Sequence, residues 1–400
     1  MELSELTDER LRILVSKQHE WMCDTNVGYL MDISCGNQTY LWGYGHFNLL
    51  WTVHGTKGRV SWVNHKNNES AEEVDRLAST MASESGLHSV AWAVSGTDGV
   101  ELAFYIKDKY WKKHNPNRQE FISFKPGYSG TSFLAQILRA EYDVPFAHVI
   151  DTGVWPTLDA REHYEARALQ QVRDLLKSNP NIGTIFMESM PWLQKFRPWS
   201  KWWWKGIRQL CDEYDCLMIV DDVMGGFGKT GKHKFTHINY NLFPDLVVSG
   251  KTLTGGYAPL SSVCVSEKVT HTVLKNFEFS HTWSPNMAGV GAANWINKCW
   301  PEDYLFNDVE YAFQKIINRF LISGDIKQGW QQGSICSMEL VKPLQPLDLI
   351  HAGIIPSGHG SYYDSNHLTI CAPIGCLEME NSYWDQLNER LDNAISSGNT

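Results

Sequence analysis

The sequence predicts an α/β protein in which helices cover a mostly parallel β-sheet, together with a smaller α+β lobe in the C-terminal third. Two patterns predict the sheet. Short apolar runs alternate with amphipathic stretches along the middle of the chain, and polar residues follow successive apolar runs. The size of the chain agrees with this prediction, because 400 residues, 43% of them hydrophobic, can bury the core of one large unit and a second, smaller one.

The predicted elements of the middle region alternate between strand and helix. In chain order they are a strand at Ser89–Val94, a helix at Asp98–Lys112, a helix at Glu162–Lys177, a strand at Gly183–Met187 ending at Glu188, a helix at Ser200–Tyr214, a strand at Cys216–Val220 ending at Asp221, and a strand at Leu246–Ser249 before Lys251. Ligands bind at the carboxyl edge of an open parallel sheet, so we expect the functional site there.

The C-terminal third has a different pattern. We expect a helix at Asp308–Leu321, short strands around Ser334–Val341 and His367–Ala372, and a closing helix near Trp384–Ile395. Outside this region, the acidic run Glu69–Asp75 predicts a solvated helix start. Tryptophans 199, 202, 203 and 204 are interpreted as packing or subunit-contact residues.

Composition and charge exclude several classes of protein. A net charge of −10 without a basic run argues against nucleic-acid binding, and no apolar stretch is long enough to span a membrane. The polar, acidic start of the chain predicts no secretory signal. Nine scattered cysteines without a Cys-x-x-Cys pair favour reduced thiols and a cytoplasmic location, and we expect no metal site.

Ser95-Gly96-Thr97-Asp98 lies between a predicted strand and a predicted helix. Glycine lets a ligand approach the backbone closely, and the N–H groups of a helix start favour a phosphate. An ordinary helix cap is the alternative, because Ser-x-x-Asp is also a capping-box pattern.

Two further glycine-rich segments carry a charged residue where a strand ends. Asp221 follows CLMIV, and a buried carboxylate there needs a cation or strong donors, such as a protonated pyridine nitrogen. Lys251 stands among small residues, where a desolvated, neutral amine can attack a carbonyl and form a Schiff base. The alternatives are a solvated, glycine-rich turn for the Asp221 segment and a surface lysine in a glycine loop for Lys251.

Taken in order, these segments resemble the class III (omega) aminotransferases, which are pyridoxal-phosphate enzymes of fold type I. The resemblance is carried by PDLVVSGKTLTGGYAPLSSVCVSEKV around Lys251 and by LMIVDDVMGGFGKTGK around Asp221. It is strongest over Cys216–Val269 and extends from about Gly28 to the C-terminus. It implies an enzyme that uses pyridoxal 5'-phosphate to move an amino group from a small-molecule amine donor to an aldehyde or ketone acceptor.

The resemblance gives a role to each matching residue. Lys251 matches the lysine that holds the cofactor as a Schiff base and later moves a proton, and Asp221 matches the aspartate paired with the pyridinium nitrogen. The other matches are Gly96 and Thr97 at the cofactor phosphate, Val223 and Tyr128 on the two faces of the ring, Glu188 near the cofactor, and Thr282, which reaches the phosphate from the neighbouring subunit. Thr282 therefore implies a homodimer with shared active sites.

Several positions depart from the family pattern. Asp222 stands where glutamate is usual, Ser129 where histidine is usual, and Ser189 replaces the proline after Glu188, so the following loop could take another path. No arginine lies between Arg319 and Arg390, where many relatives clasp a substrate carboxylate. An α-amino-acid-shaped pocket is therefore in doubt, and the candidate substitutes for that arginine are His351, His359 and His367.

Two alternatives to a transaminase stay open. The aminomutase of glutamate 1-semialdehyde shares the Ser-Gly-Thr turn and the Val223-Met224 pair. A non-catalytic relative is the other, although a scaffold has no need of Lys251 and Asp221.

The resemblance also implies a small domain built from the two termini. The predicted limits are 1–54 for its N-terminal segment, 55–298 for the large cofactor-binding domain, and 299–400 for its C-terminal part.

Overall fold

The structure is a computed structural model and describes residues 15–59, 63, 71–273, 282–355, 364–376 and 382–397. The chain divides into two compact units. The larger comprises Trp51–Phe227 and His233–Lys298, and the smaller comprises Met1–Leu50, Gly228–Lys232 and Cys299–Thr400. The predicted domain limits remain predictions. No pattern in the sequence indicated that Gly228–Lys232, in the middle of the chain, belongs with the smaller unit.

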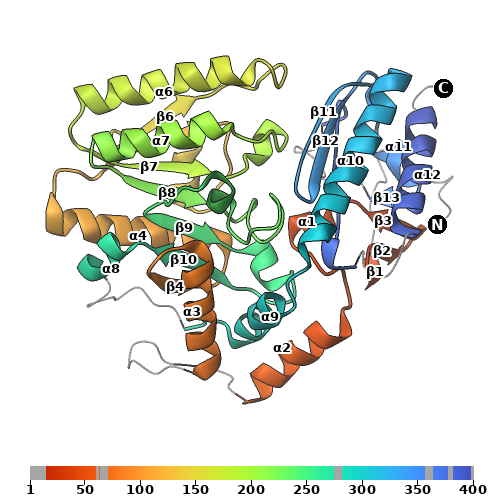
Figure 1. Cartoon of the computed structure of the whole chain (residues 1–400), viewed down its shortest axis with the longest axis horizontal. Helices are drawn as coiled ribbons and strands as arrows, with labels where there is room; N and C mark the ends of the chain where they lie inside the picture. The colour runs from red at the N-terminus through yellow and green to blue at the C-terminus, as the bar shows by residue number, and fades with distance from the viewer. Residues whose placement is uncertain are drawn as a thin grey trace. The chain divides into compact units, whose positions relative to one another are not determined.

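The described strands of the larger unit form one seven-stranded sheet in the order β4-β10-β9-β8-β7-β5-β6 (Figure 1). Their bounds are β4 Ser89–Ala93, β5 Glu120–Lys125, β6 Ala147–Asp151, β7 Ile182–Glu188, β8 Leu217–Asp221, β9 Leu246–Ser249 and β10 Ser261–Val265. Only β10 runs antiparallel to its neighbours, β4 and β9. The predicted mostly parallel sheet is confirmed, and the carboxyl ends of the other strands share one edge.

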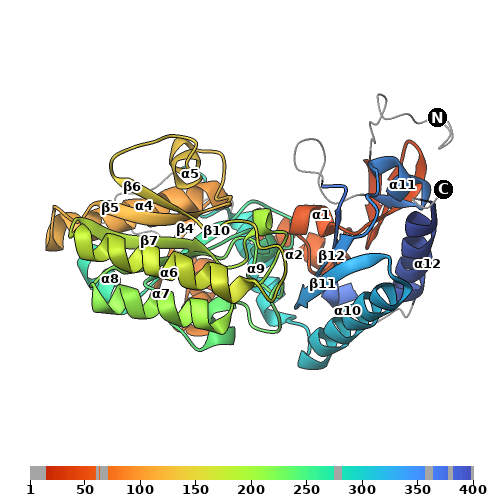
Figure 2. The same ribbon diagram turned by 90° about the horizontal axis from the view of Figure 1, so that it is seen from above.

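Helices cover both faces of this sheet. On one face α4 packs against β4, β8, β9 and β10, and on the other α6 and α7 lie side by side (Figure 2). The helices of this unit are α2 Phe47–Arg59 (which begins in the smaller unit), α3 Glu72–Ser85, α4 Gly96–His114, α5 Phe133–Leu138, α6 Arg161–Ser178, α7 Lys201–Glu213, α8 Glu267–Val273 and α9 Met287–Lys298. This is the layered arrangement expected of βαβ units.

The central strands have a buried, largely apolar composition. Every residue of β8 and β9 is buried, as expected for parallel strands covered on both faces. Helix α4 approaches closely because Gly99 lacks a side chain, and a Cβ there would lie 2.4 Å from Ser261 Oγ. The sheet therefore holds its carboxyl edge in a fixed geometry.

The tryptophan-rich stretch before and within α7 is mainly core. Trp199, Trp203 and Trp204 are buried, and the rings of Trp199 and Trp203 stack with centroids 4.5 Å apart. Trp202 is 50% exposed because it lies on the outer face of the helix. The packing interpretation is confirmed for the three buried rings.

Three helix starts can be compared with their predicted positions, and a capping side chain fixes one of them. Ser200 caps α7 by accepting a hydrogen bond from the Trp203 N–H, so the helix proper begins at Lys201. The acidic residues of the Glu69–Asp75 run that the structure describes occupy the first turn of α3, as predicted. The helix expected at Asp308–Leu321 begins earlier, at Asp303, because Pro301 just outside the helix marks its start. Glu302 occupies the N-cap position without a side-chain hydrogen bond.

The smaller unit combines residues from both ends of the chain. Its described elements are β1 Val15–His19, β2 Met22–Thr25, β3 Gly28–Asp32, α1 Cys35–Gln38, α10 Asp303–Ser323, β11 Ile326–Gln332, β12 Ile335–Leu340, α11 Pro346–His351, β13 Ile354–Ile355, β14 His367–Cys371 and α12 Ser382–Ser397. They form the sheets β1-β2-β3-β13 and β11-β12-β14.

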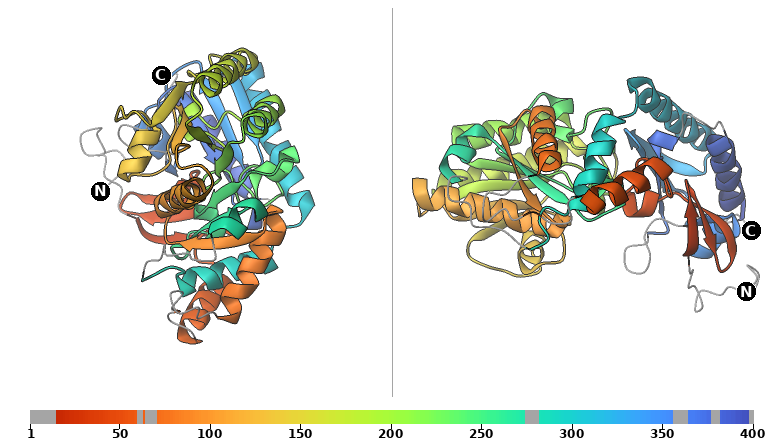
Figure 3. Two further views of the ribbon diagram at one scale, coloured as in Figure 1. Left: turned by 90° about the vertical axis from the view of Figure 1, so that its left-hand side faces the viewer. Right: turned by 90° about the horizontal axis from the view of Figure 1, so that it is seen from below.

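One core joins the two terminal regions within this unit. Trp21, between β1 and β2, meets Tyr383 of α12 edge to face at 5.4 Å, and both are buried in the cluster that includes α10. The right-hand view of Figure 3 shows the N-terminal strands and the C-terminal helix of this unit close together. The central segment Gly228–Lys232 joins this unit through buried Lys229, whose Nζ donates to the Tyr40 carbonyl at 3.1 Å. None of the described helices is both long enough and apolar enough to cross a bilayer.

Candidate active site

The carboxyl edge of the larger unit's sheet holds a cavity of about 170 Å³. Its lining contains these residues predicted from the sequence: Gly96, Thr97, Tyr128, Glu188, Asp221, Val223 and Lys251. Thr282 is exposed and lies outside that lining. One chain therefore brings together all of the predicted site residues except the one expected to act on a neighbouring subunit.

Strand pairing places two carboxylates side by side. Glu188 at the end of β7 pairs in register with Asp221 at the end of β8. The ladder extends one residue further, because the backbone N–H of Ser189 donates to the Asp221 carbonyl at 2.8 Å. Proline, usual at this position in the family, has no N–H to donate. The serine therefore supports a local hydrogen bond that the usual residue could not make.

Asp221 is buried with neutral hydrogen-bond donors. Its carboxylate accepts from the Val223 N–H at 3.1 Å and from the Ser129 hydroxyl. Burial raises the pKa of Asp221 to about 6, and these hydrogen bonds and the Lys251 charge oppose that rise. A buried carboxylate in this setting gains most from a cationic partner placed in the cavity.

Asp222 has different surroundings, although it is the next residue. Its two oxygens accept from the backbone N–H and the hydroxyl of Thr236 at 2.9 and 2.5 Å, and it is not part of the cavity lining. Burial raises the pKa of Asp222 to about 7. Asp222 therefore fixes the following turn, and Asp221 is the carboxylate that faces the cavity.

Glu188 forms the neighbouring part of the wall. It accepts a hydrogen bond from the Tyr128 N–H at 2.7 Å. Desolvation, and then the negative charge of Asp221, raise the pKa of Glu188 to about 8. At neutral pH the Glu188 carboxyl thus carries a proton, and Asp221 is the acidic group of this pair that ionises first.

The turn at the start of α4 is both a helix cap and an anion-binding geometry. Ser95 Oγ accepts from the Asp98 N–H at 3.2 Å, while Asp98 accepts from the Val94 N–H at 2.8 Å. The N–H groups of the first turn, at Gly96 and Thr97, have no acceptor within the helix and favour an anion. The structure therefore confirms the helix cap, and phosphate binding at this turn stays a prediction.

Glycines bring the surrounding turns into contact. A Cβ on Gly96 would lie 2.8 Å from Val223 Cγ1, and a Cβ on Gly130 would lie 2.3 Å from Thr97 Oγ1. Gly130 also has a φ of +113°, which favours glycine. Any side chain at these positions would fill or distort the space between the α4 turn and the turn that follows β5.

Lys251 is held in a strained backbone conformation at the end of β9. Its φ is +41°, uncommon for a residue with a side chain, and such strain concentrates at functional sites. The side chain is half-buried, and Nζ lies 3.6 Å from Met224 Sδ, a weak acceptor. The fold therefore presents the Lys251 amine to the cavity.

These features fit the chemical groups of pyridoxal phosphate. A helix N-terminus suits its phosphate, the buried Asp221 carboxylate suits a protonated ring nitrogen, and the Lys251 amine suits its aldehyde. The lack of a side chain at Gly96 and Gly130 leaves room for a ligand at the turn.

The structure also adds cavity residues that the sequence did not indicate as ligands. Trp192 begins the short 3-10 helix η4 (Trp192–Gln194) after β7, and its ring meets that of Tyr128 edge to face at 5.4 Å. Met224, the residue after Val223, also lines the cavity. Ser95, Ser129 and Gly130 line the cavity too, and the signal for them was their position inside the recognised motifs.

The structure describes two of the three histidines that were considered as substitutes for the missing arginine. His367 Nδ1 lies 3.0 Å from Asp364 Oδ2, and its Nε2 lies 4.0 Å from Glu339 Oε2. A ring between two carboxylates is poorly suited to clasp a third. His351 is exposed at the end of α11, and His359 lies outside the described residues.

Comparison with known proteins gives a consistent result. The family model described as "Aminotransferase class-III" matches residues 5–394. An adenosylmethionine-8-amino-7-oxononanoate aminotransferase of Anoxybacillus flavithermus is 25% identical over 380 residues, covering 82% of this chain and 79% of that protein. A putrescine–pyruvate aminotransferase of Pseudomonas aeruginosa is 23% identical over 315 residues, covering 72% of this chain and 67% of that protein.

Solved structures match over nearly the whole chain. A transaminase from the marine bacterium Virgibacillus has a TM-score of 0.83 at 20% identity, covering 98% of this chain and 94% of that one. An amine transaminase from an uncultivated Pseudomonas species, in its PLP-bound form, has a TM-score of 0.83 at 15% identity, covering 98% and 97%. The predicted fold class, that of fold type I enzymes, is therefore confirmed.

Proposed function

The chain belongs to the class-III aminotransferase family, and on that premise we propose that it works through Lys251 and Asp221. It is a pyridoxal-phosphate-dependent transaminase, which moves an amino group from a small-molecule amine to a carbonyl compound. Among the alternatives, an aminomutase is not favoured by the aminotransferase relatives. The proposal rests chiefly on one observation, that Lys251, Asp221 and the N-terminus of α4 line the same cavity.

We propose that the lining residues hold the cofactor by its separate groups. Gly96 and Thr97 bind the phosphate through the first N–H groups of α4. Val223 and Tyr128 pack against the two faces of the ring, and Lys251 makes the covalent link. When bound, pyridoxal phosphate supplies an aldehyde that condenses with amines and a ring that withdraws electrons from the carbon next to nitrogen.

The two buried carboxyl groups then have different tasks. Asp221 ionises at neutral pH, since its pKa is about 6, and a cationic partner lowers that pKa further. It holds the proton on the ring nitrogen. Glu188, with a pKa of about 8, stays protonated and adds no second negative charge beside Asp221. Lys251 Nζ moves the proton between the substrate carbon and the cofactor carbon.

Borohydride reduction followed by peptide mass spectrometry tests this assignment. Borohydride fixes the link between a lysine and the cofactor, and we expect the adduct on Lys251. The buried lysines Lys229 and Lys234 are the internal controls and should be unmodified. An adduct on either of them would overturn the role given to Lys251.

The amine donor is proposed to lack an α-carboxylate. The support is the absence of arginine between Arg319 and Arg390, together with the position of His367 between two carboxylates. A half-reaction screen would compare a diamine or simple primary amine with α-amino acids, following loss of the cofactor absorption band and release of free oxo product. Faster reaction with α-amino acids would contradict this preference, and internal amine migration without free product would favour the aminomutase.

We further propose that the working unit is a homodimer in which Thr282 completes the phosphate site of the partner subunit. Thr282 is exposed and outside the cavity of its own chain, and the next residue, Trp283, is 61% exposed. Phe47 and Trp51 on α2 are 74% and 69% exposed, which is unusual for large apolar side chains. A dimer interface would bury such groups.

Sedimentation with and without pyridoxal phosphate tests the dimer. We expect the cofactor to favour the dimer by mass action, and Thr282→Ala to weaken cofactor affinity without removing Lys251 modification. A fully active monomer with unchanged cofactor affinity in the variant would reject the idea. A cytoplasmic location is also proposed, on the support of the cysteine side chains that the structure describes, none of which forms a disulfide.

A further inference from the structure

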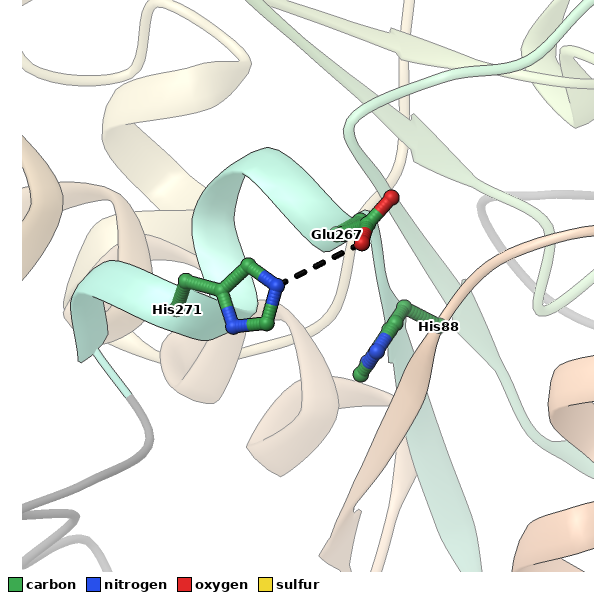
Figure 4. A group of neighbouring side chains, drawn as sticks. All are labelled: His88, Glu267 and His271. Carbon is green, nitrogen blue, oxygen red and sulfur yellow. Dashed lines mark hydrogen bonds and ion pairs between the residues drawn. The ribbon is translucent and has the colours of Figure 1, made fainter.

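The edge of the sheet opposite the active site carries a side-chain cluster that transamination does not use. His88 lies just before β4, and Glu267 and His271 lie one turn apart on α8 (Figure 4). Ligand atoms of the three residues all lie within 4.8 Å of one another, and all three side chains are exposed. Imidazole nitrogens and a carboxylate oxygen are ligands that divalent transition metals accept.

The backbone around this cluster is fixed by the sheet. The His88 N–H donates to the Val265 carbonyl at 2.9 Å, and Ser89 pairs in register with Val265 at the end of β10. The Ser89 and Thr270 hydroxyls are hydrogen-bonded at 2.6 Å, which ties the start of β4 to α8. The ligands therefore come from two elements whose separation is already set, and a metal would have only side chains to order.

The observed spacing is close to that of a coordination site. His271 Nε2 lies 3.4 Å from Glu267 Oε1 (Figure 4). Two ligand atoms on a tetrahedral zinc are separated by about 3.4 Å, given metal–ligand bonds of about 2.0–2.1 Å. The rings of His88 and His271 have centroids 5.3 Å apart, so small rotations suffice to direct both toward one ion.

Local charge also favours a cation. With neutral imidazoles the cluster carries the single negative charge of Glu267. The nearby cation on α8, Lys268, is engaged elsewhere, since its Nζ lies 3.1 Å from Asp215 Oδ1. Attraction of the ion is therefore not opposed by an unpaired lysine at this position.

We propose that His88, Glu267 and His271 form a binding site for a divalent transition-metal cation, with Zn²⁺ as the representative ion. Bound there, the ion joins α8 to β4, the strand at the edge of the sheet. It binds the folded chain in preference to the unfolded one, so it raises thermal stability by mass action. The site is independent of the cofactor and of the proposed catalytic residues.

Calorimetric titration of the holoenzyme with Zn²⁺, after treatment with a chelator, tests the site. We expect one saturating ion per chain and a rise in Tm. His88→Ala, Glu267→Gln and His271→Ala should each weaken zinc binding by at least roughly tenfold. His114→Ala is the matched control, because His114 is an exposed histidine that contacts α8 through Thr272 but lies outside the cluster. This control should bind zinc as the wild type does.

A Co²⁺ titration followed by visible absorption provides a second readout that does not depend on stability. The wild type and His114→Ala should develop cobalt–imidazole bands, and the His88→Ala/His271→Ala double variant should not. Lack of saturable zinc binding in the wild type would overturn the proposal. So would zinc affinity in the double variant equal to that of the wild type. Neither result would bear on Lys251, because transamination does not use this cluster.

Discussion

The two edges of the larger unit's sheet place polar residues in opposite environments. At the carboxyl edge, Asp221 and Glu188 line an internal cavity, and the pKa of each carboxyl is raised by burial. At the amino edge, His88, Glu267 and His271 are exposed. Both groups of residues lie at edges of one sheet, so the difference comes from what covers each edge.

This difference determines what each group of residues can do. Buried charges interact strongly with whatever enters the cavity, because little water screens them. Exposed groups interact weakly with one another and become organised only around a bound ion. Substitutions at the carboxyl edge should therefore change catalysis by large factors.

The largest effect is expected for Lys251→Ala. Loss of the amine removes both the covalent link and the proton-transfer group, so turnover should fall by at least roughly 10²–10⁴-fold. Steady-state kinetics with a saturating amine would measure this. Lys268→Ala, at the amino edge, is the control and should retain activity. Comparable losses in both variants would break the distinction between the two edges.

Asp221→Asn should have the next largest effect. The amide cannot keep the ring nitrogen protonated, so turnover should fall by roughly 10²-fold or more, with a smaller loss of cofactor affinity. Asp222→Asn is the informative comparison, because Asp222 is bound to Thr236 outside the cavity and its loss should mainly lower stability. If the turnover losses were reversed between the two variants, Asp222 would be the acidic partner.

The pH dependence of apoenzyme stability tests the buried carboxyls directly. The folded-state pKa of Asp221 is raised from 3.8 to about 6, so the folded protein binds the proton more tightly than the unfolded chain does. Stability from this group is present below the unfolded pKa and is lost as pH rises through the folded pKa. The shift corresponds to about 3 kcal/mol.

Urea unfolding of the apoenzyme between about pH 4 and pH 8 measures this loss. Glu188 and Asp222, whose pKa values are raised to about 8 and about 7, add to it in the same direction. Asp221→Asn should show a shallower decline. The buried His237, whose pKa is lowered to about 4, contributes in the opposite direction, so the variant and the wild type are compared at each pH. Equal pH dependence in the two proteins would mean that Asp221 is not buried as described.

The smallest effect concerns the serine that replaces the family's proline. Ser189→Pro removes the N–H that donates to the buried Asp221 carbonyl, so stability should fall by roughly 1–3 kcal/mol. Ser189→Ala retains that N–H and should change stability much less. Thermal unfolding of both variants provides the measurement. Equal stability would indicate that the loop after β7 can adopt the path of its relatives.

Much of the active-site edge was predictable because strand ends have a local signature. The predicted strand at Leu246–Ser249 is the observed β9, and the charged residues after β8 and β9 do line the cavity. Trp192 could not be predicted, since nothing in the local sequence marks the short 3-10 helix after β7 as part of the cavity wall. The antiparallel strand β10 also depends on long-range pairing, with β4 and β9.

The proposed metal site shows the same limitation more strongly. Glu267 and His271 are one helical turn apart, but His88 comes from a distant part of the chain and meets them through the pairing of β4 with β10. No spacing rule connects these positions, so the sequence led us to expect no metal site.

The sequence by itself determined the chemistry available to this protein: an amine at Lys251, a carboxylate at Asp221 and a helix start at Gly96, each directly after a strand. Their order along the chain was sufficient to indicate the family. The resemblance had already assigned the cofactor role to Asp221, and only the tertiary structure shows why Asp222, the next residue, does not line the cavity. Successive residues leaving a strand point in opposite directions, and the packing of Thr236 against Asp222 leaves Asp221 at the cavity wall.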